Sequence, residues 1–117
     1  GDYTEGMFAM MQNDTPDDWV LATGETHSVK EFAKEAFNHV GLNWKDYVLT
    51  SEKYSRPNEV HHLLGDASKA KDILGWEPKT SFNELVKKMV DSDLELANRE
   101  KVLIDNNLMT PTWEYAT

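Results

Sequence analysis

The 117-residue sequence contains no cysteine, which excludes disulfide bonds, thiolate metal sites and cysteine nucleophiles. Cations are scarce, because 12 lysines and arginines stand against 21 aspartates and glutamates, for a formal net charge of -9. A basic surface for nucleic acid or anionic lipid is therefore not expected, although one arginine could still hold a single phosphate group. No apolar run approaches the ~20 residues that cross a bilayer, and no signal peptide is visible at the N-terminus. These absences favour a cytoplasmic protein.

Self-contained catalytic motifs are missing as well. The sequence has no glycine-rich dinucleotide fingerprint, no phosphate-loop lysine, no G-x-S-x-G and no H-E-x-x-H. His61 and His62 are adjacent, so on a strand they would point to opposite faces and could not chelate one metal ion. His27 stands just before an expected helix, where it fits a turn residue better than a ring lining a ligand cleft. The motifs therefore assign no catalytic residue and no metal ligand to this chain.

Helix signals are abundant, within a composition of 39% hydrophobic and 28% charged residues that is ordinary for one folded domain. Two helices are expected to begin at Ser-x-x-Glu capping boxes, at Ser28 and Ser81. Two are expected to stop at glycines, Gly41 and Gly75. Apolar residues recur every three or four positions in four segments, which predicts helices over 4–12, 29–40, 67–74 and 82–97.

Strand signals are fewer. Apolar and β-branched runs predict strands at 19–22 and 47–50, with a third, shorter one at 60–64. We therefore expect an α/β chain that is rich in helix and has two or three short strands. So few strands cannot cover the apolar faces of these helices, which indicates either oligomerisation or a place in a larger protein. Residues 102–117 lack clear periodicity and are expected to form a loosely held tail.

One segment, K-Y-S-R-P-N-E-V at 53–60, suggests a specific chemistry. Arg56 precedes a proline, which disfavours helix at Arg56 and holds its backbone extended. A guanidinium presented at a fixed angle suits forked recognition of phosphate oxygens. Glu59 accepts hydrogen bonds when ionised and could bind a ribose diol. From spacing alone, a surface loop with a chance Arg–Glu pair explains this short pattern slightly better.

The order of several motifs changes that balance. A-T-G-E-T-H-S-V at 22–29 is followed by R-P-N-E-V at 56–60, G-D-A-S-K-A at 65–70 and L-G-W-E-P-K at 74–79. This order resembles the C-terminal part of the GDP-mannose 4,6-dehydratase family, which belongs to the extended short-chain dehydrogenases/reductases. The second and fourth motifs are common among nucleotide-sugar enzymes of that superfamily, whereas the first is more specific. The resemblance reaches about Lys101, and the tail beyond it has no assigned counterpart.

The resemblance implies that residues 1–117 are the nucleotide-sugar-binding portion of a two-part lyase. Arg56 would contact the substrate diphosphate, and Glu59 would contact the ribose. An N-terminal Rossmann part, outside this chain, would bind NADP and hold the catalytic residues. The implied reaction is oxidation at C4, loss of water across C5–C6 and return of the hydride to C6, giving GDP-4-keto-6-deoxy-mannose on the route to GDP-fucose. The full-length enzyme would be a homodimer or homotetramer, and this portion alone, which has no Tyr-x-x-x-Lys, would be inactive.

Two other interpretations remain open. The first is a portion of a related nucleotide-sugar epimerase or reductase, which contacts to the guanine would separate from a dehydratase. The second is a non-catalytic helical module that binds a protein partner through an exposed apolar stripe. Such a module should be a monomer that melts cooperatively and has no affinity for GDP. Ser55 and His61 replace the phenylalanine and aspartate expected beside R-P-x-E-V, which bears on fine substrate contacts and leaves the expected fold unchanged.

Overall fold

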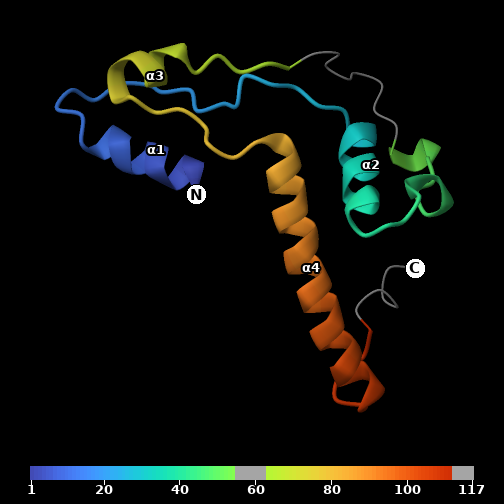
Figure 1. The fold of residues 1–117 in the computed structure, drawn as a ribbon. Coiled ribbons are helices and arrows are strands. Elements are labelled where there is room, and N and C mark those ends of the chain that lie inside the picture. Colours follow the sequence, from blue (N-terminus) through green and yellow to red (C-terminus); the bar gives the residue numbers. More distant parts are fainter. Residues whose placement is uncertain (55–62, 112–117) are drawn as a thin grey trace.

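The computed structural model describes residues 1–54 and 63–111, and all the regular structure within these residues is helical. The elements in chain order are α1 (Asp2–Met11), α2 (Val29–His39), the single-turn 3-10 helices η1 (Trp44–Asp46) and η2 (Glu52–Tyr54), α3 (Ser68–Leu74) and α4 (Phe82–Asp105). Helix α1 lies against α3 at one end of the molecule, and α2 packs along α4 at the other (Figure 1). The helix-rich part of the expected fold is confirmed.

The ends of the helices follow from local sequence. The Ser28 hydroxyl accepts a hydrogen bond from the Glu31 N–H, and the Glu31 carboxylate accepts one from the Ser28 N–H. Ser81 and Glu84 form the same reciprocal pair at the start of α4. Both predicted capping boxes are therefore confirmed. Helix α3 ends at Gly75, whose φ of 65° is a left-handed conformation that a side chain would disfavour.

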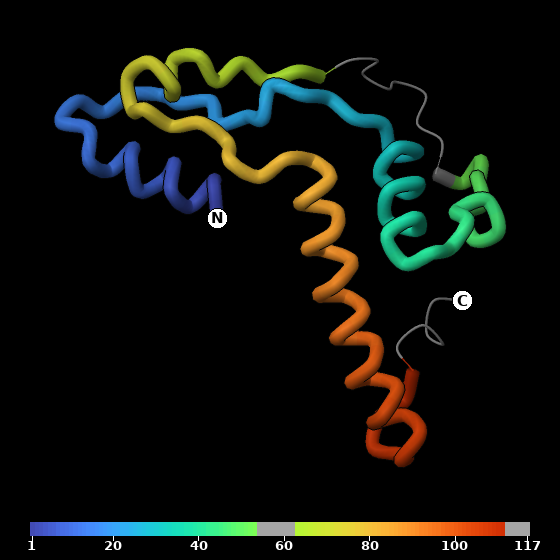
Figure 2. The backbone as a smooth tube through the Cα atoms, viewed as in Figure 1, coloured from blue at the N-terminus to red at the C-terminus, as the bar shows by residue number. Residues whose placement is uncertain are grey.

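The predicted strands at 19–22 and 47–50 are wrong for this structure, because both segments are irregular. Of the third predicted strand, residues 60–62 lie outside the described residues, and residues 63 and 64 are irregular. The chain at Gly65 nevertheless lies beside the first segment, since a Cβ on Gly65 would overlap the Cβ of Ala22 (Figure 2). The apolar residues at 19–22 therefore indicated correctly that this segment packs against another part of the chain. A strand also needs a ladder of backbone hydrogen bonds, and none joins these segments within the described residues.

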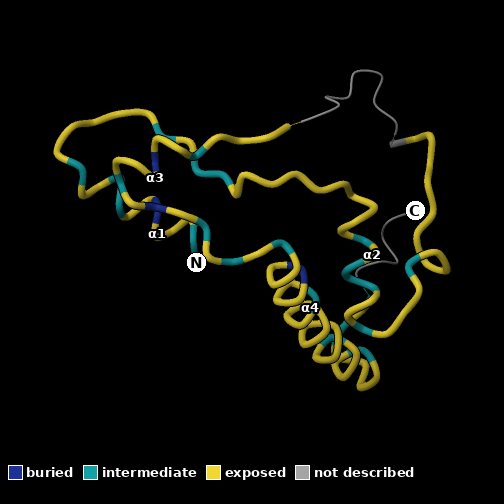
Figure 3. Tube along the Cα trace, turned by 45° about the horizontal axis from the view of Figure 1, so that its top comes forward, coloured by how far each residue is buried: buried dark blue, intermediate teal, exposed yellow. Residues whose placement is uncertain are grey.

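The packed interior is small and lies in two places, as the few dark segments of Figure 3 show. Ala70 and Trp76 are buried between α1 and α3, and Val86 is buried where α4 meets α2. The Trp76 Nε1 donates a hydrogen bond to the carbonyl of Asp2 at 2.7 Å. Gly6 permits this close approach, because a Cβ there would lie 3.0 Å from that same nitrogen. Gly6 in the middle of α1 therefore lowers the intrinsic stability of the helix but leaves room for Trp76 to pack against it.

A side chain of α1 also fixes the segment that leads into α4. The Asp2 carboxylate accepts hydrogen bonds from the backbone N–H groups of Thr80 at 2.8 Å and Lys79 at 2.9 Å. These two bonds lower the pKa of Asp2. The Lys79 ammonium adds an ion pair with Glu5 at 2.6 Å. With the Trp76–Asp2 hydrogen bond, four polar contacts therefore join the segment before α4 to α1.

Helix α4 is longer than the sequence pattern indicated. It continues to Asp105, so the first residues of the predicted tail, 102–105, are helical, and how loosely the tail is held stays a prediction. An ion pair between Lys101 and Asp105 at 2.9 Å spans the last turn, and the Asn106 side-chain amide donates to the carbonyl of Val102. Such local polar contacts stabilise the end of a helix even where apolar residues do not recur every three or four positions, so the sequence pattern did not reveal this last part of α4. Residues 112–117 lie outside the described residues.

The molecule is extended for its size. Its radius of gyration is 19.2 Å, whereas a compact chain of this length has about 13 Å. Its accessible surface is 9968 Å², against about 6,500 Å² for a compact protein of 13.4 kDa. The helices therefore leave much of their apolar surface uncovered, as expected from the small number of strands.

Candidate functional site

The residues that the sequence assigned to substrate binding are Arg56 and Glu59. Both lie outside the described residues, together with Ser55, His61 and His62. The roles of Arg56 and Glu59 therefore stay predictions. The described residues nearest to them in the sequence are Tyr54 at the end of η2 and Leu63.

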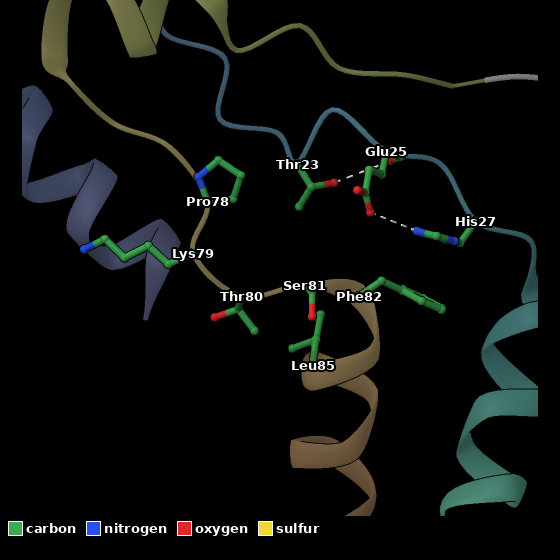
Figure 4. Close-up of a pocket in the computed structure, with 9 residues that line it drawn as sticks. All are labelled: Thr23, Glu25, His27, Pro78, Lys79, Thr80, Ser81, Phe82 and Leu85. Atoms are coloured by element: carbon green, nitrogen blue, oxygen red, sulfur yellow. Dashed lines mark hydrogen bonds and ion pairs between the residues drawn. The ribbon is translucent and has the colours of Figure 1, made fainter.

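A cavity of about 480 Å³ lies between the segment that precedes α2 and the start of α4 (Figure 4). Its wall is built from the A-T-G-E-T-H-S-V motif on one side and, on the other, from the end of L-G-W-E-P-K and the residues that follow it. The lining residues are Thr23, Glu25, His27, Pro78, Lys79, Thr80, Ser81, Phe82 and Leu85. The fold thus brings together two of the motifs that carry the family resemblance.

His27 and Phe82 form the contact that closes this wall. Their rings are stacked, with centroids 3.8 Å apart and planes 12° from parallel. The His27 Nε2 lies 3.3 Å from a carboxylate oxygen of Glu25, and Nδ1 lies 4.0 Å from one of Glu31. His27 is in an irregular segment, as a turn residue would be. It also lines a cavity, which the preferred interpretation of the sequence left out.

The charged groups around the cavity already have partners. The backbone N–H of Ser28 donates to Glu31 and lowers the pKa of that carboxyl, and the N–H of Ser81 does the same for Glu84. At the start of each of the two helices that begin at the cavity, the N–H groups of the capping serine and of the glutamate three residues later are therefore engaged by side chains of the same capping box. The Lys79 ammonium is paired with Glu5 and points away from the cavity in Figure 4. The wall consequently offers ring faces and hydroxyl groups rather than an unpaired charge.

Two kinds of catalytic arrangement are not found among the described residues. Across residues 1–54 and 63–111, no group of three or more histidine, aspartate or glutamate side chains is placed to hold a metal ion. Within the same residues, the partners of the His27 ring are two carboxylates and an aromatic ring, so a histidine–hydroxyl pair for nucleophilic catalysis is not assembled there. No helix in the described part of the chain is both long enough and apolar enough to span a membrane.

Comparison with known proteins gives a consistent result. The model of the family described as GDP-mannose 4,6 dehydratase matches residues 1–89. GDP-mannose 4,6 dehydratase 1 of Arabidopsis thaliana is 60% identical over 109 residues, which cover 93% of this chain and 30% of that protein. The human GDP-mannose 4,6 dehydratase is 45% identical over 112 residues, covering 81% of this chain and 30% of the human protein. That of Dictyostelium discoideum is 46% identical over 111 residues, covering 80% and 31%.

These matches define how much of the relatives the chain represents. It spans about 30% of their length. Because the Arabidopsis match covers 109 of the 117 residues, it includes residues 9–109 whichever end is left out. The sequence analysis assigned no counterpart in the family to the residues beyond Lys101. This is corrected, because the similarity to the Arabidopsis protein continues through the end of α4.

Proposed function

Because the chain belongs to the GDP-mannose 4,6-dehydratase family, we propose that it is the nucleotide-sugar-binding portion of such an enzyme. The full-length protein would convert GDP-mannose to GDP-4-keto-6-deoxy-mannose as a lyase of the short-chain dehydrogenase/reductase type. The observation that carries this proposal is the family match over residues 1–89, which contains the R-P-N-E-V motif. In this proposal the full-length protein is cytoplasmic and forms a homodimer or homotetramer.

In this proposal Arg56 binds the diphosphate of GDP-mannose and Glu59 binds its ribose. A guanidinium presents several N–H donors in a planar fork that matches two phosphate oxygens. A carboxylate accepts hydrogen bonds only, as a pair of ribose hydroxyls requires. Arg56 is also one of only two arginines in a chain with a net charge of -9, and the other, Arg99, lies on α4.

The NADP of the family does not fit the described residues of this chain. A pyrophosphate is usually held by free N–H groups at a helix N-terminus that follows a glycine-rich turn. No glycine-rich turn precedes α2 or α4, and at both helix starts the capping-box carboxylate, that of Glu31 or Glu84, would repel a phosphate. We therefore assign cofactor binding to the part of the full-length protein outside these 117 residues, and expect this chain alone to be inactive.

The alternatives are separated by the comparisons and by one measurement. The matched model and the relatives described above bear the dehydratase name, which favours this assignment over an epimerase or reductase of the same superfamily. A non-catalytic module that binds a protein partner would show no heat of binding with GDP. Calorimetry with GDP and GDP-mannose therefore discriminates between the binding portion of an enzyme and an interaction module.

Substitution of Arg56 tests the proposed site directly. In the full-length protein, R56A should weaken binding of GDP-mannose by at least about tenfold, because a charge-assisted hydrogen bond contributes about 1.5–3 kcal/mol. R56K should recover only part of this loss, since an ammonium lacks the planar fork. Titration calorimetry gives the dissociation constants.

The matched control is R99A. Arg99, the other arginine of the chain, is exposed on α4 and paired with Glu95, so its removal should leave GDP-mannose binding unchanged. Equal dissociation constants for wild type and R56A would show that the assignment of Arg56 is wrong.

A further inference from the structure

An apolar groove of about 290 Å³ lies between α2 and the middle of α4. Its walls include Phe37 and Val40 on the side of α2, and Val90 and Ala97 on α4, whereas Asp93 is the one charged residue of the lining. Among the described elements, α4 packs against α2 alone and η1 packs against α2 alone, so no third element bridges the two helices. Small-molecule sites usually bring several polar groups together. The groove therefore suits an apolar occupant better than a small polar ligand.

The α4 wall of this groove is part of a longer apolar stripe. Val90, Ala97 and Ile104 follow one another at intervals of seven residues. Because seven residues are close to two helical turns, the three side chains share one face of α4. Val90 and Ala97 line the groove, whereas Ile104 lines a second cavity at the end of the helix, together with Met109 and Pro111. The groove and the residues that follow α4 therefore lie on the same side of this helix.

The chain turns back beside α4 directly after the helix ends, as the red end of the ribbon shows (Figure 1). Asn107 has a φ of 56°, a left-handed conformation that reverses the chain direction. The N–H of Leu108 donates a hydrogen bond to the carbonyl of Leu103 at 2.8 Å. Pro111 then shares a cavity with Ile104, although it lies six residues beyond the helix end. The described chain therefore runs back along α4, in the direction of Ala97 and the groove.

The next residues in the sequence, 112–117, lie outside the described residues and carry two aromatic side chains, Trp113 and Tyr115. In an extended segment, side chains two positions apart point to the same side, so both would face α4 as Pro111 does. The four residues from Pro111 to Tyr115 span about 13 Å when extended. The seven residues from Ile104 to Ala97 span about 10 Å of helix. The segment is therefore long enough to bring Tyr115 to the groove.

We propose that residues 112–117 dock on α4 and that Trp113 and Tyr115 cover the apolar groove between α2 and α4. The ring of Tyr115 packs on apolar walls while its hydroxyl stays in contact with water. Ala97 leaves room for an aromatic ring at this point of α4. A second copy of the chain is a less favourable occupant, because it brings a further net charge of -9. The proposal goes beyond substrate binding and does not depend on Arg56.

Site-specific cross-linking identifies what covers the groove. In the full-length protein, the photoreactive amino acid p-benzoylphenylalanine replaces Tyr115, and tandem mass spectrometry maps the cross-linked peptides after irradiation. We expect cross-links within one chain to residues 36–40 or 90–97. The same replacement at Glu114, on the opposite side of an extended segment, should give at least about fivefold fewer of these cross-links. A product of twice the chain mass would assign the groove to a second copy, and cross-links elsewhere or none at all would equally overturn the proposal.

A charge placed in the groove provides the second test. Chymotrypsin cleaves after aromatic residues, and docking should protect the bonds after Trp113 and Tyr115. In the full-length protein, A97E should speed these two cleavages at least about fivefold, because a buried carboxylate disfavours the docked segment. N98E is the matched control, since Asn98 is exposed on the same turn of α4 and does not line the groove.

Cleavage after Trp113 and Tyr115 should proceed at the wild-type rate in N98E. Equal rates in wild type and A97E would overturn the proposal. Thermal melting shows whether both variants fold, and the cross-linking test, which leaves the groove unaltered, decides the question if A97E does not. Titration with GDP-mannose should give the same dissociation constant for wild type and A97E, which separates this proposal from that for Arg56.

Discussion

In residues 1–54 and 63–111, which contain no β-sheet, a few single side chains hold distant segments together. The indole of Trp76 donates to the carbonyl of Asp2, and the carboxylate of Asp2 accepts from two backbone N–H groups ahead of α4. His27 stacks on Phe82 and thereby joins the starts of α2 and α4. Each of these contacts is polar or aromatic and directional. They fix geometry with little buried area, which suits a molecule whose interior is small.

Val86 is the residue whose packing can be tested most cleanly. It is 1% exposed in α4, so V86A should destabilise the protein by about 2 kcal/mol through lost burial and the cavity left behind. The control is V102A on the same helix, because Val102 is 60% exposed and the same change should cost less than about 0.5 kcal/mol. Urea unfolding of the full-length protein measures both. Equal losses would mean that Val86 is packed no more tightly than Val102, because alanine is the better helix former and propensity alone would stabilise both variants.

At the scale of the elements, the contact that local sequence does not explain is one between two irregular segments. Residues 19–22 run beside the chain at Gly65, where a Cβ would overlap that of Ala22. The helices around them follow from local signals, since capping boxes begin α2 and α4 and Gly75 ends α3. The contact between the two segments depends instead on one residue that has no side chain.

Exchanging two small residues tests this contact. G65A should destabilise the protein, because the new Cβ and the Cβ of Ala22 cannot occupy the same space and neither can rotate away. The double variant G65A/A22G removes the opposing Cβ and should recover most of the lost stability. Thermal melting of the full-length protein gives both values. A double variant as unstable as G65A alone would mean that the two segments do not pack against each other.

At the scale of the whole molecule, acidic side chains in hydrogen bonds set the response to pH. Hydrogen bonds lower the pKa values of Asp2, Glu31, Asp66 and Glu84, and a contact with Lys69 lowers that of Asp17. The folded state therefore binds fewer protons than the unfolded state in the acid range. The stability that these groups contribute is present above the ordinary carboxyl pKa and is lost as the pH falls through the lowered values.

Acid unfolding should accordingly begin below about pH 4 and steepen toward pH 2. D2N should reduce the pH dependence, because an amide cannot be protonated in this range, and D14N is the control, since no contact of Asp14 is part of this set. Urea unfolding of the full-length protein at several pH values measures the change. Stability that stays constant between pH 5 and about pH 3 would contradict the expectation.

How far the sequence predicts this protein depends on whether a feature is local. The serine–glutamate spacing at 28–31 and 81–84 predicted two helix starts correctly, because a capping box is complete within four residues. The strands at 19–22 and 47–50 were predicted wrongly, because a strand exists only with a hydrogen-bonded neighbour. A ring lining a cleft was the less favoured of two interpretations of His27, and it could not be ranked higher because its partner Phe82 is distant in the sequence. Arg56 and Glu59 remain predictions of the sequence.

The amino-acid sequence by itself determined the helices, their caps and, through the order of its motifs, the family. These properties depend on the neighbouring residues or on direct similarity, so they need no knowledge of the fold. Only the tertiary structure decided which apolar sides are covered. Val86 is buried in α4, while Met7 and Leu85 are exposed and line a cavity between α1 and α4, although all three are apolar residues of helices. The physical reason is that burial depends on what lies across from a side chain, and periodicity along one helix does not contain that information.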